Sequence, residues 1–203
     1  MQIILATSNK GKVREIRTLF EGEEVLPFAD LLGPMEIEEN GDTFAQNALI
    51  KARAIFDTLK RDDVIVVSDD SGITVPALGN EPGIYSARYA GEGASDRENL
   101  QKLVQKLKEK GLSSAPAYYT AAIAVVAPGA AYVMHGWMHG KVIDTPRGEG
   151  GFGYDPIFIP EGFDQTLGEL APEVKKRLSH RSKALRLAKP IIEMLGRTLV
   201  IGH

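Results

Sequence analysis

The sequence predicts an α/β protein whose helices flank a mixed β-sheet. Helical patterns alternate with apolar runs in the first half, a strand-rich stretch covers residues 118–143, and a helical pattern closes the chain. With 203 residues, 43% hydrophobic and 25% charged, the chain has an ordinary globular composition and enough length for one sizeable core. We expect a single domain over residues 1–203, built as two lobes with a boundary near residue 115.

The chain opens with a short apolar run that suits a buried strand, followed by the polar turn TSNKGK. A helix is then expected over residues 10–20, with one apolar face made by Val13, Ile16, Leu19 and Phe20. Strand, Gly-Lys turn and helix are also the parts of a Walker phosphate loop, which requires G-x-x-x-x-G-K-[ST]. Here the first glycine is missing and Val13 replaces the Ser or Thr, which excludes a phosphate-loop kinase.

A second helix is expected after Thr43, which can form a capping box with Gln46. Asn47 and Lys51, one turn apart, lie together at the edge of its apolar stripe, where they could reach a phosphate. The β-branched run VIVVS, residues 64–68, then suits a buried strand.

The second half repeats these signals. Ser95 and Glu98 form another capping box, and Gly111 ends the helix that they open. Two strands are expected to turn at residues 128–129. The last helix is expected from about Ser179 toward Leu195, interrupted or kinked near Pro190.

Charge and composition exclude several classes of protein. A formal charge of -3 gives no general attraction to nucleic acid or to anionic membranes. The absence of cysteine excludes disulfides, thiolate nucleophiles and cysteine-based zinc sites. No secretory signal and no stretch of transmembrane length is evident. We expect a cytoplasmic protein that binds neither nucleic acid nor membranes.

The stretch VVSDDSGITV carries the strongest chemical signal. We expect a buried strand to end at Asp69 and Asp70, with Ser71 and Gly72 turning the chain. Two adjacent carboxylates are costly unless a cation lies near, and Mg²⁺ binds a few carboxylate oxygens together with substrate phosphate. A plain turn rich in Asp, Ser and Gly is an equal alternative.

More acids precede the second helix. For Glu36, Glu38 and Asp42 the simpler interpretation is that acids near a first turn suit the helix dipole. One member of the acidic group could nevertheless complete a metal site with Asp70.

The glycine-rich stretch PRGEGGFGYDPIFIP could expose Phe152 and Tyr154 for stacking on a planar base. A tight inter-strand loop with a packed Phe is equally consistent with it. Further on, His180 and Arg181 follow the candidate N-cap Ser179, where the helix dipole disfavours cations. Their placement indicates that they serve an anionic or polar ligand.

The opening turn has the features of an anion site. Thr7, Ser8 and Asn9 offer hydroxyl and amide groups, Lys10 and Lys12 are cationic, and the helix that follows presents its N-terminal amides. Phosphate donors, carboxylates for a metal and an aromatic loop for a base together indicate a nucleoside triphosphate with Mg²⁺.

Six motifs occur in an order that matches a known family: TSNKGK, EENGDTFAQNALIKA, DDSG, PGIYSARYAG, GGFGYDPIF and SHRSKAL. The chain closely resembles the inosine triphosphate pyrophosphatases, which hydrolyse non-standard purine nucleoside triphosphates (ITP, dITP, XTP). The resemblance runs from Ile3 to about Leu187. It implies a nucleotide-binding cleft between the lobes, a homodimer, and Mg²⁺-dependent cleavage between the α and β phosphates that yields the monophosphate and pyrophosphate.

The resemblance also implies roles for individual residues. Asp70 would bind the metal and accept the proton of the attacking water, with Glu39 and Asp69 as further metal-associated carboxylates. The residues implied to bind substrate are Thr7, Ser8, Asn9, Lys10, Gly11, Lys12, Ser71, Phe152, Gly153, Tyr154, Asp155, Lys175, His180 and Arg181.

Two other functions remain alternatives. One is a Maf-like pyrophosphatase acting on pyrimidine or modified nucleotides, against which the FGYD and SHR motifs argue. The other is a nucleotide sensor that binds without hydrolysis, which the full carboxylate set disfavours. Selectivity for purines with a 6-oxo group would come from donors such as His180, Arg181 or a backbone N–H, which adenine would leave unpaired.

Overall fold

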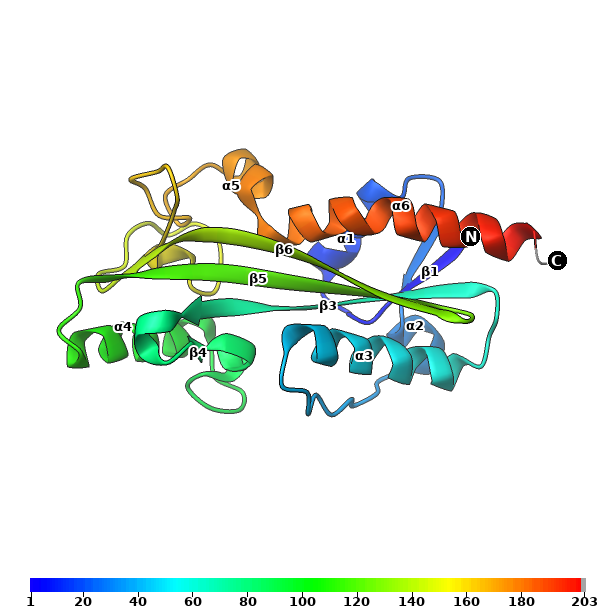
Figure 1. The fold of residues 1–203 in the computed structure, drawn as a ribbon, viewed down its shortest axis with the longest axis horizontal. Helices are drawn as coiled ribbons and strands as arrows, with labels where there is room; N and C mark the ends of the chain where they lie inside the picture. The colour runs from blue at the N-terminus through cyan, green and yellow to red at the C-terminus, as the bar shows by residue number, and fades with distance from the viewer. Residues whose placement is uncertain (202–203) are drawn as a thin grey trace. The chain divides into compact units, whose positions relative to one another are not determined.

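A computed structural model describes residues 1–201 of the chain (Figure 1). The strands are β1 (Gln2–Leu5), β2 (Glu24–Pro27), β3 (Val64–Val75), β4 (Glu81–Pro82), β5 (Ser114–Ala127), β6 (Ala130–Ile143) and β7 (Phe158–Pro160). Within the described residues these seven strands form one sheet in the order β2-β1-β3-β5-β6-β7, with β4 paired to β3. The sheet is mixed, because β1 pairs in parallel with β2 and β3 whereas β7 runs antiparallel to β6. The predicted α/β class is confirmed.

The helices are α1 (Lys10–Leu19), α2 (Ala29–Leu32), α3 (Phe44–Leu59), α4 (Asp96–Glu109), α5 (Pro172–Leu178) and α6 (His180–Ile201). Three short 3₁₀ segments within residues 1–201 complete the structure: η1 (Pro76–Leu78), η2 (Gly83–Arg88) and η3 (Asp155–Ile157). No helix in this part of the chain combines the length and the apolar character needed to cross a membrane.

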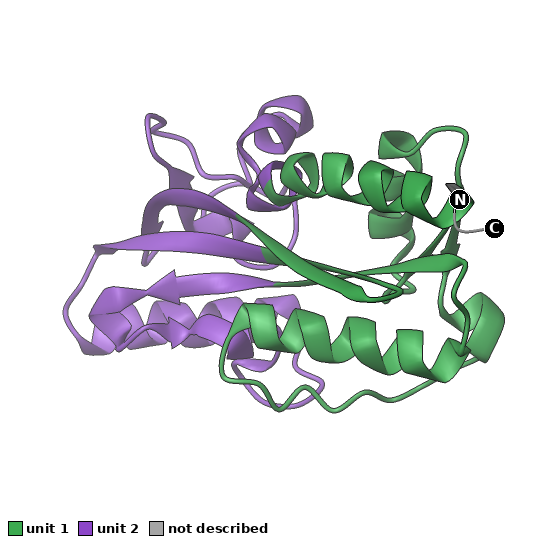
Figure 2. Ribbon diagram, turned by 45° about the vertical axis from the view of Figure 1, so that its right-hand side comes forward, with its two compact units in different colours: residues 1–70, 122–135, 184–203 green, residues 71–121, 136–183 purple. Residues whose placement is uncertain are grey.

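The chain divides into two compact units, each built from separate segments (Figure 2). Unit 1 comprises residues 1–70, 122–135 and 184–203, and unit 2 comprises residues 71–121 and 136–183. The chain passes between the units four times, and the passage at 121/122 is the one nearest to the boundary expected near residue 115. β3, β5, β6 and α6 each contribute residues to both units.

In unit 1 the parallel strands β1 and β3 are buried on both faces. Alternate residues of β3, including Val64 and Val66, pack with Ala48, Ala52 and Ile55 of α3. The views agree that α3 covers one face of these strands and α6 covers the other (Figures 1 and 2). Apolar side chains on both faces explain the continuous β-branched run that predicted this strand.

Unit 2 has its own core, in which Leu100, Leu103 and Leu107 of α4 pack with Ile73 and other buried side chains. Helix α4 begins with the predicted capping box: Ser95 accepts a hydrogen bond from Glu98 N, and Glu98 accepts one from Ser95 N. Its end is also as predicted, since Gly111 follows the last turn in the left-handed region at φ 67°.

Two expectations about chain direction are corrected. β3 does not end at Asp70, and residues 71–72 do not turn the chain. The strand continues to Val75 because the apolar run that follows is buried in the core of unit 2.

The short helix α5 was not predicted from the sequence. The last helix contains Pro190 in its interior and continues to Ile201, beyond the end expected near residue 195.

Candidate active site

The TSNKGK turn is held in shape by its own side chains. Asn9 is the N-cap of α1, and its Oδ1 accepts hydrogen bonds from the backbone N–H groups of Gly11 (3.0 Å) and Lys12 (3.1 Å). Thr7 Oγ1 accepts from Asn9 N at 3.1 Å, while Ser8 and Lys10 are exposed. The N–H groups of Gly11 and Lys12, which the sequence suggested as donors to an anion, are thus already hydrogen-bonded to Asn9. The turn is pre-formed, and its lysines, the exposed Ser8 and the Nδ2 group of Asn9 are left to meet a phosphate.

The adjacent acids Asp69 and Asp70 face opposite sides of the sheet. Successive side chains of a strand alternate between its two faces, and β3 runs on through both residues. Asp69 Oδ2 pairs with Lys12 Nζ of α1 at 2.8 Å. Asp70 lies near Lys51 Nζ of α3 at 3.9 Å. A different lysine therefore lies beside each of the two carboxylates, which reduces the repulsion that the sequence alone suggested.

Lys51 is the centre of this cluster. Its ammonium group lies 3.1 Å from Glu39 Oε1 and 3.9 Å from Asp70 Oδ1, and it donates a hydrogen bond to the main-chain oxygen of Asp69 at 2.6 Å. We call Lys12, Lys51, Glu39, Asp69 and Asp70 the lysine–carboxylate cluster. The structure brings Glu39 and Asp70 to one cation, as expected for a shared site, and places Asp69 on the other face.

Asp70 has an unusual environment. Burial raises the pKa of its carboxyl from 3.8 to about 6, and the charges of Glu39 and Asp69 add to the rise, whereas Lys51 and Lys12 oppose it. Within residues 1–201 no group donates a hydrogen bond to its buried Oδ2. An acid with a raised pKa and an unpartnered oxygen suits a proton acceptor or a metal ligand.

The carboxylates fit a hard divalent cation that also binds substrate. In the part of the chain that the structure describes, no three acidic or histidine side chains gather closely enough to hold a metal unaided. Mg²⁺ commonly takes only one or two protein carboxylates and completes its shell with water and substrate phosphate. Glu39 and Asp70, with the unpartnered Asp70 Oδ2, supply that donor set.

Asn47 differs from its sequence-based expectation. It was placed with Lys51 at a phosphate, yet it is only 2% exposed, and its Oδ1 accepts a hydrogen bond from Gly41 N at 2.8 Å. Its amide oxygen thus holds the segment that carries Glu39.

The glycine-rich stretch of unit 2 forms an anchored loop with an exposed aromatic ring. Phe152 is 65% exposed, and Lys175 Nζ lies 4.6 Å from the centre of its ring. The buried Asp155 pairs with Lys175 and also accepts a hydrogen bond from Phe152 N at 3.0 Å. The structure thus brings three of the predicted residues together.

Further contacts fix the same loop. Gly153 N donates to Asp96 Oδ2 of α4 at 2.9 Å, and the Tyr154 hydroxyl donates to the main-chain oxygen of Ser86 at 2.7 Å. Tyr154 is therefore buried as a support and does not present a ring for stacking. Sequence reasoning missed Asp96 and Ser86, because a capping-box neighbour and a turn serine carry no signal of a distant partner.

The start of α6 lies where the SHR motif predicted. Ser179 Oγ accepts a hydrogen bond from Ser182 N, as an N-cap does. The His180 ring stacks on Tyr119 at 4.8 Å between centroids and 11° between planes. Arg181 follows it in the first turn and is partly buried, as is Ser71 in β3.

Comparison with known proteins gives the family. The model of the Ham1 family matches residues 3–191. The chain belongs to the Ham1 family. A Sulfurovum sp. (strain NBC37-1) protein named dITP/XTP pyrophosphatase is 65% identical to this Ham1 chain over 96% of it and 95% of the relative. A Campylobacter jejuni subsp. jejuni (serotype O:2) protein with the same name is 53% identical, over 97% of the chain and 100% of the relative.

Solved structures agree with this Ham1 assignment. The Ham1 protein of Staphylococcus aureus superposes with a TM-score of 0.87 at 38% identity, covering 95% of this chain and 98% of that one. A nucleoside-triphosphatase / dITP/XTP pyrophosphatase of Mycobacterium abscessus gives a TM-score of 0.76, also at 38% identity, over 92% and 98%. The resemblance drawn from the six sequence motifs is confirmed.

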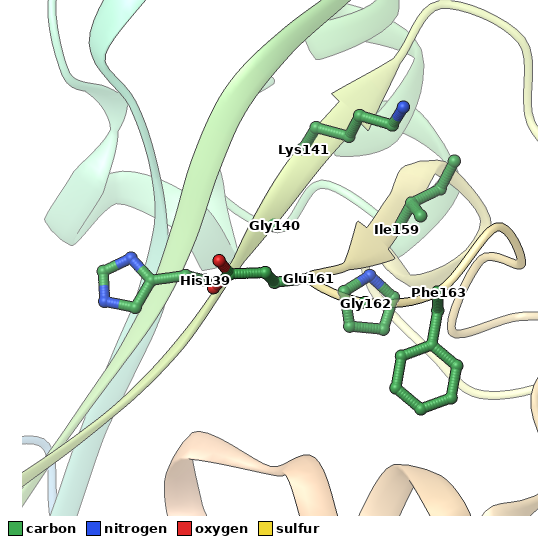
Figure 3. Close-up of a pocket in the computed structure, with 8 residues that line it drawn as sticks. His139, Gly140, Lys141, Ile159, Glu161, Gly162 and Phe163 are labelled. Atoms are coloured by element: carbon green, nitrogen blue, oxygen red, sulfur yellow. The ribbon is translucent and has the colours of Figure 1, made fainter.

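A cavity of about 470 Å³ in unit 2 of the Ham1 chain lies away from these residues. His139 and Lys141 of β6 and Glu161 and Phe163 from the turn after β7 line it (Figure 3). None of the residues predicted to bind substrate or metal is among those that line it. The candidate catalytic and base-binding groups of the Ham1 chain therefore lie in the lysine–carboxylate cluster and the glycine-rich loop.

Proposed function

We propose that this chain hydrolyses non-standard purine nucleoside triphosphates (dITP, XTP and ITP) to the nucleoside monophosphate and pyrophosphate, which keeps these nucleotides out of DNA and RNA. Full-length relatives named dITP/XTP pyrophosphatase support the reaction. The observation that carries it is Asp70, a partly buried acid with a buried, unpartnered oxygen and a pKa raised to about 6 beside a lysine.

In unit 1 the proposed chemistry is phosphoryl transfer to water. Asp70 accepts a proton from the attacking water as the water oxygen bonds to phosphorus. The bond between the attacked phosphorus and the α–β bridging oxygen breaks, which separates the monophosphate from pyrophosphate. Lys12 and Lys51, together with residues 7–11, offset the negative charge of the phosphates. The pKa near 6 leaves Asp70 ionised, and so able to take a proton, at neutral pH.

Mg²⁺ is the metal that we propose for this site, held by Asp70 and Glu39. Asp69 remains a candidate member of the metal site, although its observed partner, Lys12, indicates that it orients this lysine. When bound, the ion supplies positive charge to the phosphate oxygens.

In unit 2 we propose that the loop of Phe152–Asp155 binds the base. The exposed Phe152 ring supplies a stacking surface, worth about 1–3 kcal/mol per base in comparable proteins. Lys175, His180 and Arg181 provide donors, and Ser71 is a further substrate contact. A 6-oxo group would accept from such donors, whereas the 6-amino group of adenine would leave a buried donor unpaired. We further propose that the protein is a cytoplasmic homodimer.

The test is an assay of pyrophosphate release with Mg²⁺ over a panel of ITP, XTP, dITP, UTP, dUTP and ATP. We expect turnover of the first three, with monophosphate and pyrophosphate formed in equal amounts. Preference for UTP or dUTP would establish the Maf-like alternative. Tight ITP binding without any pyrophosphate would establish the sensor. Release of inorganic phosphate in place of pyrophosphate would contradict cleavage between the α and β phosphates.

A further inference from the structure

Two helices of the chain begin with similar side-chain contacts. The predicted capping box is complete only in α4, because in α3 the Gln46 side chain accepts from Asp42 N and not from Thr43 N. In α3 the N-cap Thr43 accepts a hydrogen bond from Gln46 N, and the buried Asn47 follows. In α4 the N-cap Ser95 accepts from Glu98 N, and the buried Asn99 follows. In both, the asparagine Oδ1 accepts at 2.8 Å from a backbone N–H of the preceding segment, that of Gly41 or Ala90. The two helices differ in what that segment carries.

The segment before α3 is tightly fitted to the first turn of the helix. Gln46 Oε1 accepts a hydrogen bond from Asp42 N at 2.6 Å, one residue from the bond between Asn47 and Gly41. A Cβ added at Gly41 would lie 2.7 Å from Gln46 Cβ and 2.8 Å from Asn47 Oδ1, closer than real contacts allow. The backbone of residues 41–42 is thus fixed against α3 by two side-chain amides and by the lack of a side chain at Gly41.

The same helix fixes the partner of Glu39. Lys51 lies one turn after Asn47 on α3, and its ammonium is 3.1 Å from Glu39 Oε1. Glu39 precedes Gly41 by two residues. The Asn47–Gly41 hydrogen bond therefore fixes the position of the main chain near Glu39 relative to Lys51 and Asp70.

We propose that Asn47 is a positioning residue that holds Glu39 for the divalent metal through Gly41. This role rests on the proposed pyrophosphatase function, and it involves no contact between Asn47 and substrate. Asn99 makes the equivalent bond to a segment that contains no member of the lysine–carboxylate cluster, and its Nδ2 donates to the main-chain oxygen of Ala87. It is therefore a matched control with the same burial and the same bond.

The test compares Asn47→Leu with Asn99→Leu in the full chain. Both lose a buried acceptor and should lower the melting temperature. Only Asn47→Leu should raise the Mg²⁺ concentration for half-maximal pyrophosphate release, by about tenfold, as loss of a group that supports a metal ligand does. Asn47→Asp, which keeps an acceptor oxygen for Gly41 N, should recover most of the wild-type Mg²⁺ requirement.

A second readout does not need turnover. Mn²⁺ affinity, measured by electron paramagnetic resonance on the complex with α,β-methylene-ITP, should fall by a similar factor of about ten in Asn47→Leu alone. If Asn47→Leu does not fold, Gly41→Ala displaces the same segment from the other side of the bond and should give the same weakening.

Equal Mg²⁺ and Mn²⁺ responses in the Asn47→Leu and Asn99→Leu variants would overturn the positioning role while leaving the proposed function intact. A wild-type protein that binds Mn²⁺ but releases no pyrophosphate would overturn the proposed function, and the Mn²⁺ affinities would then decide on Asn47. A wild-type complex that binds no Mn²⁺ would overturn both.

Discussion

At the scale of single residues, the site depends on an acid that the fold keeps in an unfavourable place. Asp70 is largely shielded from solvent, yet its salt-bridge partner Lys51 is 3.9 Å away and is shared with Glu39 and with the main chain of Asp69. Part of its charge is therefore uncompensated. Proteins commonly accept such a cost at functional sites, because a strained or desolvated group is a reactive one.

Asp70→Asn should abolish pyrophosphate release, preserve ITP binding and make the protein more stable at pH 8. The pKa of Asp70 is about 6 in the folded chain against an ordinary 3.8, so ionisation favours the unfolded state. Its contribution to stability is full below pH 3.8 and is lost as the pH rises through about 6. For a side chain that is 17% exposed, the difference corresponds to about 3 kcal/mol at most.

Urea denaturation of both proteins at pH 4 and pH 8 measures this effect. We expect an increase of about 1–3 kcal/mol in the free energy of unfolding of Asp70→Asn at pH 8, and little difference at pH 4. Asp63→Asn is the control, because Asp63 is 49% exposed and pairs with Arg61 at the surface. A variant no more stable than the wild type at pH 8 would show that Asp70 is not held in an unfavourable charged state.

The sequence could not reveal how this acid is arranged. Residue type indicated Asp70 as a metal carboxylate, the family resemblance added Glu39, and the structure brings both to one lysine. The sequence predicted that the strand ends at Asp69 and Asp70, whereas a continuous strand sends their side chains to opposite faces. That outcome depends on whether residues 73–75 are buried in a second core, which lies beyond the reach of a local pattern.

At the scale of elements, the glycine-rich loop shows how a segment rich in flexible glycines can be held in one conformation. Gly150 N donates to the main-chain oxygen of Gly168 at 3.0 Å, and Thr166 Oγ1 donates to that of Arg147 at 2.6 Å. A Cβ at Gly148, where φ is +85°, would lie 2.4 Å from the carbonyl carbon of Gly168. The glycines thus allow two backbone segments to approach closely, which leaves the exposed Phe152 on an anchored support.

Gly148→Ala should therefore destabilise the protein and weaken substrate binding. The change adds left-handed strain and a backbone overlap, together about 2–4 kcal/mol. We expect a lower melting temperature and a higher KM for XTP, because the loop with Phe152 must shift.

Gly129→Ala is the matched control for this loop variant. Gly129 also has a positive φ, +71°, but nothing lies within 4 Å of an added Cβ. It should cost only about 1–2 kcal/mol of strain and leave the KM unchanged. Equal effects of the two substitutions on KM would contradict the anchoring role of the close approach.

Elements with local signals were predicted well, and those that depend on distant partners were not. Capping residues predicted the starts of α3 and α4, and the predicted turn at residues 128–129 lies between β5 and β6. Each of these predictions rests on a signal contained within a few neighbouring residues. The short helix α5 has no side-chain cap, and its run of basic residues was its one visible feature in the sequence. The loop of Phe152 is likewise anchored by residues distant in sequence, Asp96 and Ser86, and Ser86 is more than 60 residues away.

At the scale of the whole molecule, lysines offset most of the negative charge of the site, and we expect the chain to fold without a metal. Within unit 1, Lys12 and Lys51 lie against the carboxylates of Asp69, Glu39 and Asp70. Each unit also has its own apolar core. The protein therefore differs from small metal-dependent domains, whose binding energy for the metal is their folding energy.

Removal of divalent metal should abolish activity without unfolding the chain. With excess EDTA we expect no pyrophosphate release from ITP and a melting temperature lowered by less than about 4 °C, the shift that 1 kcal/mol gives in a chain of this size. Differential scanning calorimetry with and without EDTA, followed by recovery of activity on adding Mg²⁺, measures both effects. A much larger fall in melting temperature would mean that the metal is part of the folded structure.

The path of the chain through its two units also limits how the protein can change over generations. The four passages between units include one at the peptide bond between Asp70, in unit 1, and Ser71, in unit 2. Unit 1 is encoded in three separate stretches and unit 2 in two, so no single crossover within the gene can exchange one unit whole. A recombinant of two relatives would inherit each unit as a mosaic. The two units are therefore expected to diverge together by point substitution and not to be shuffled as modules.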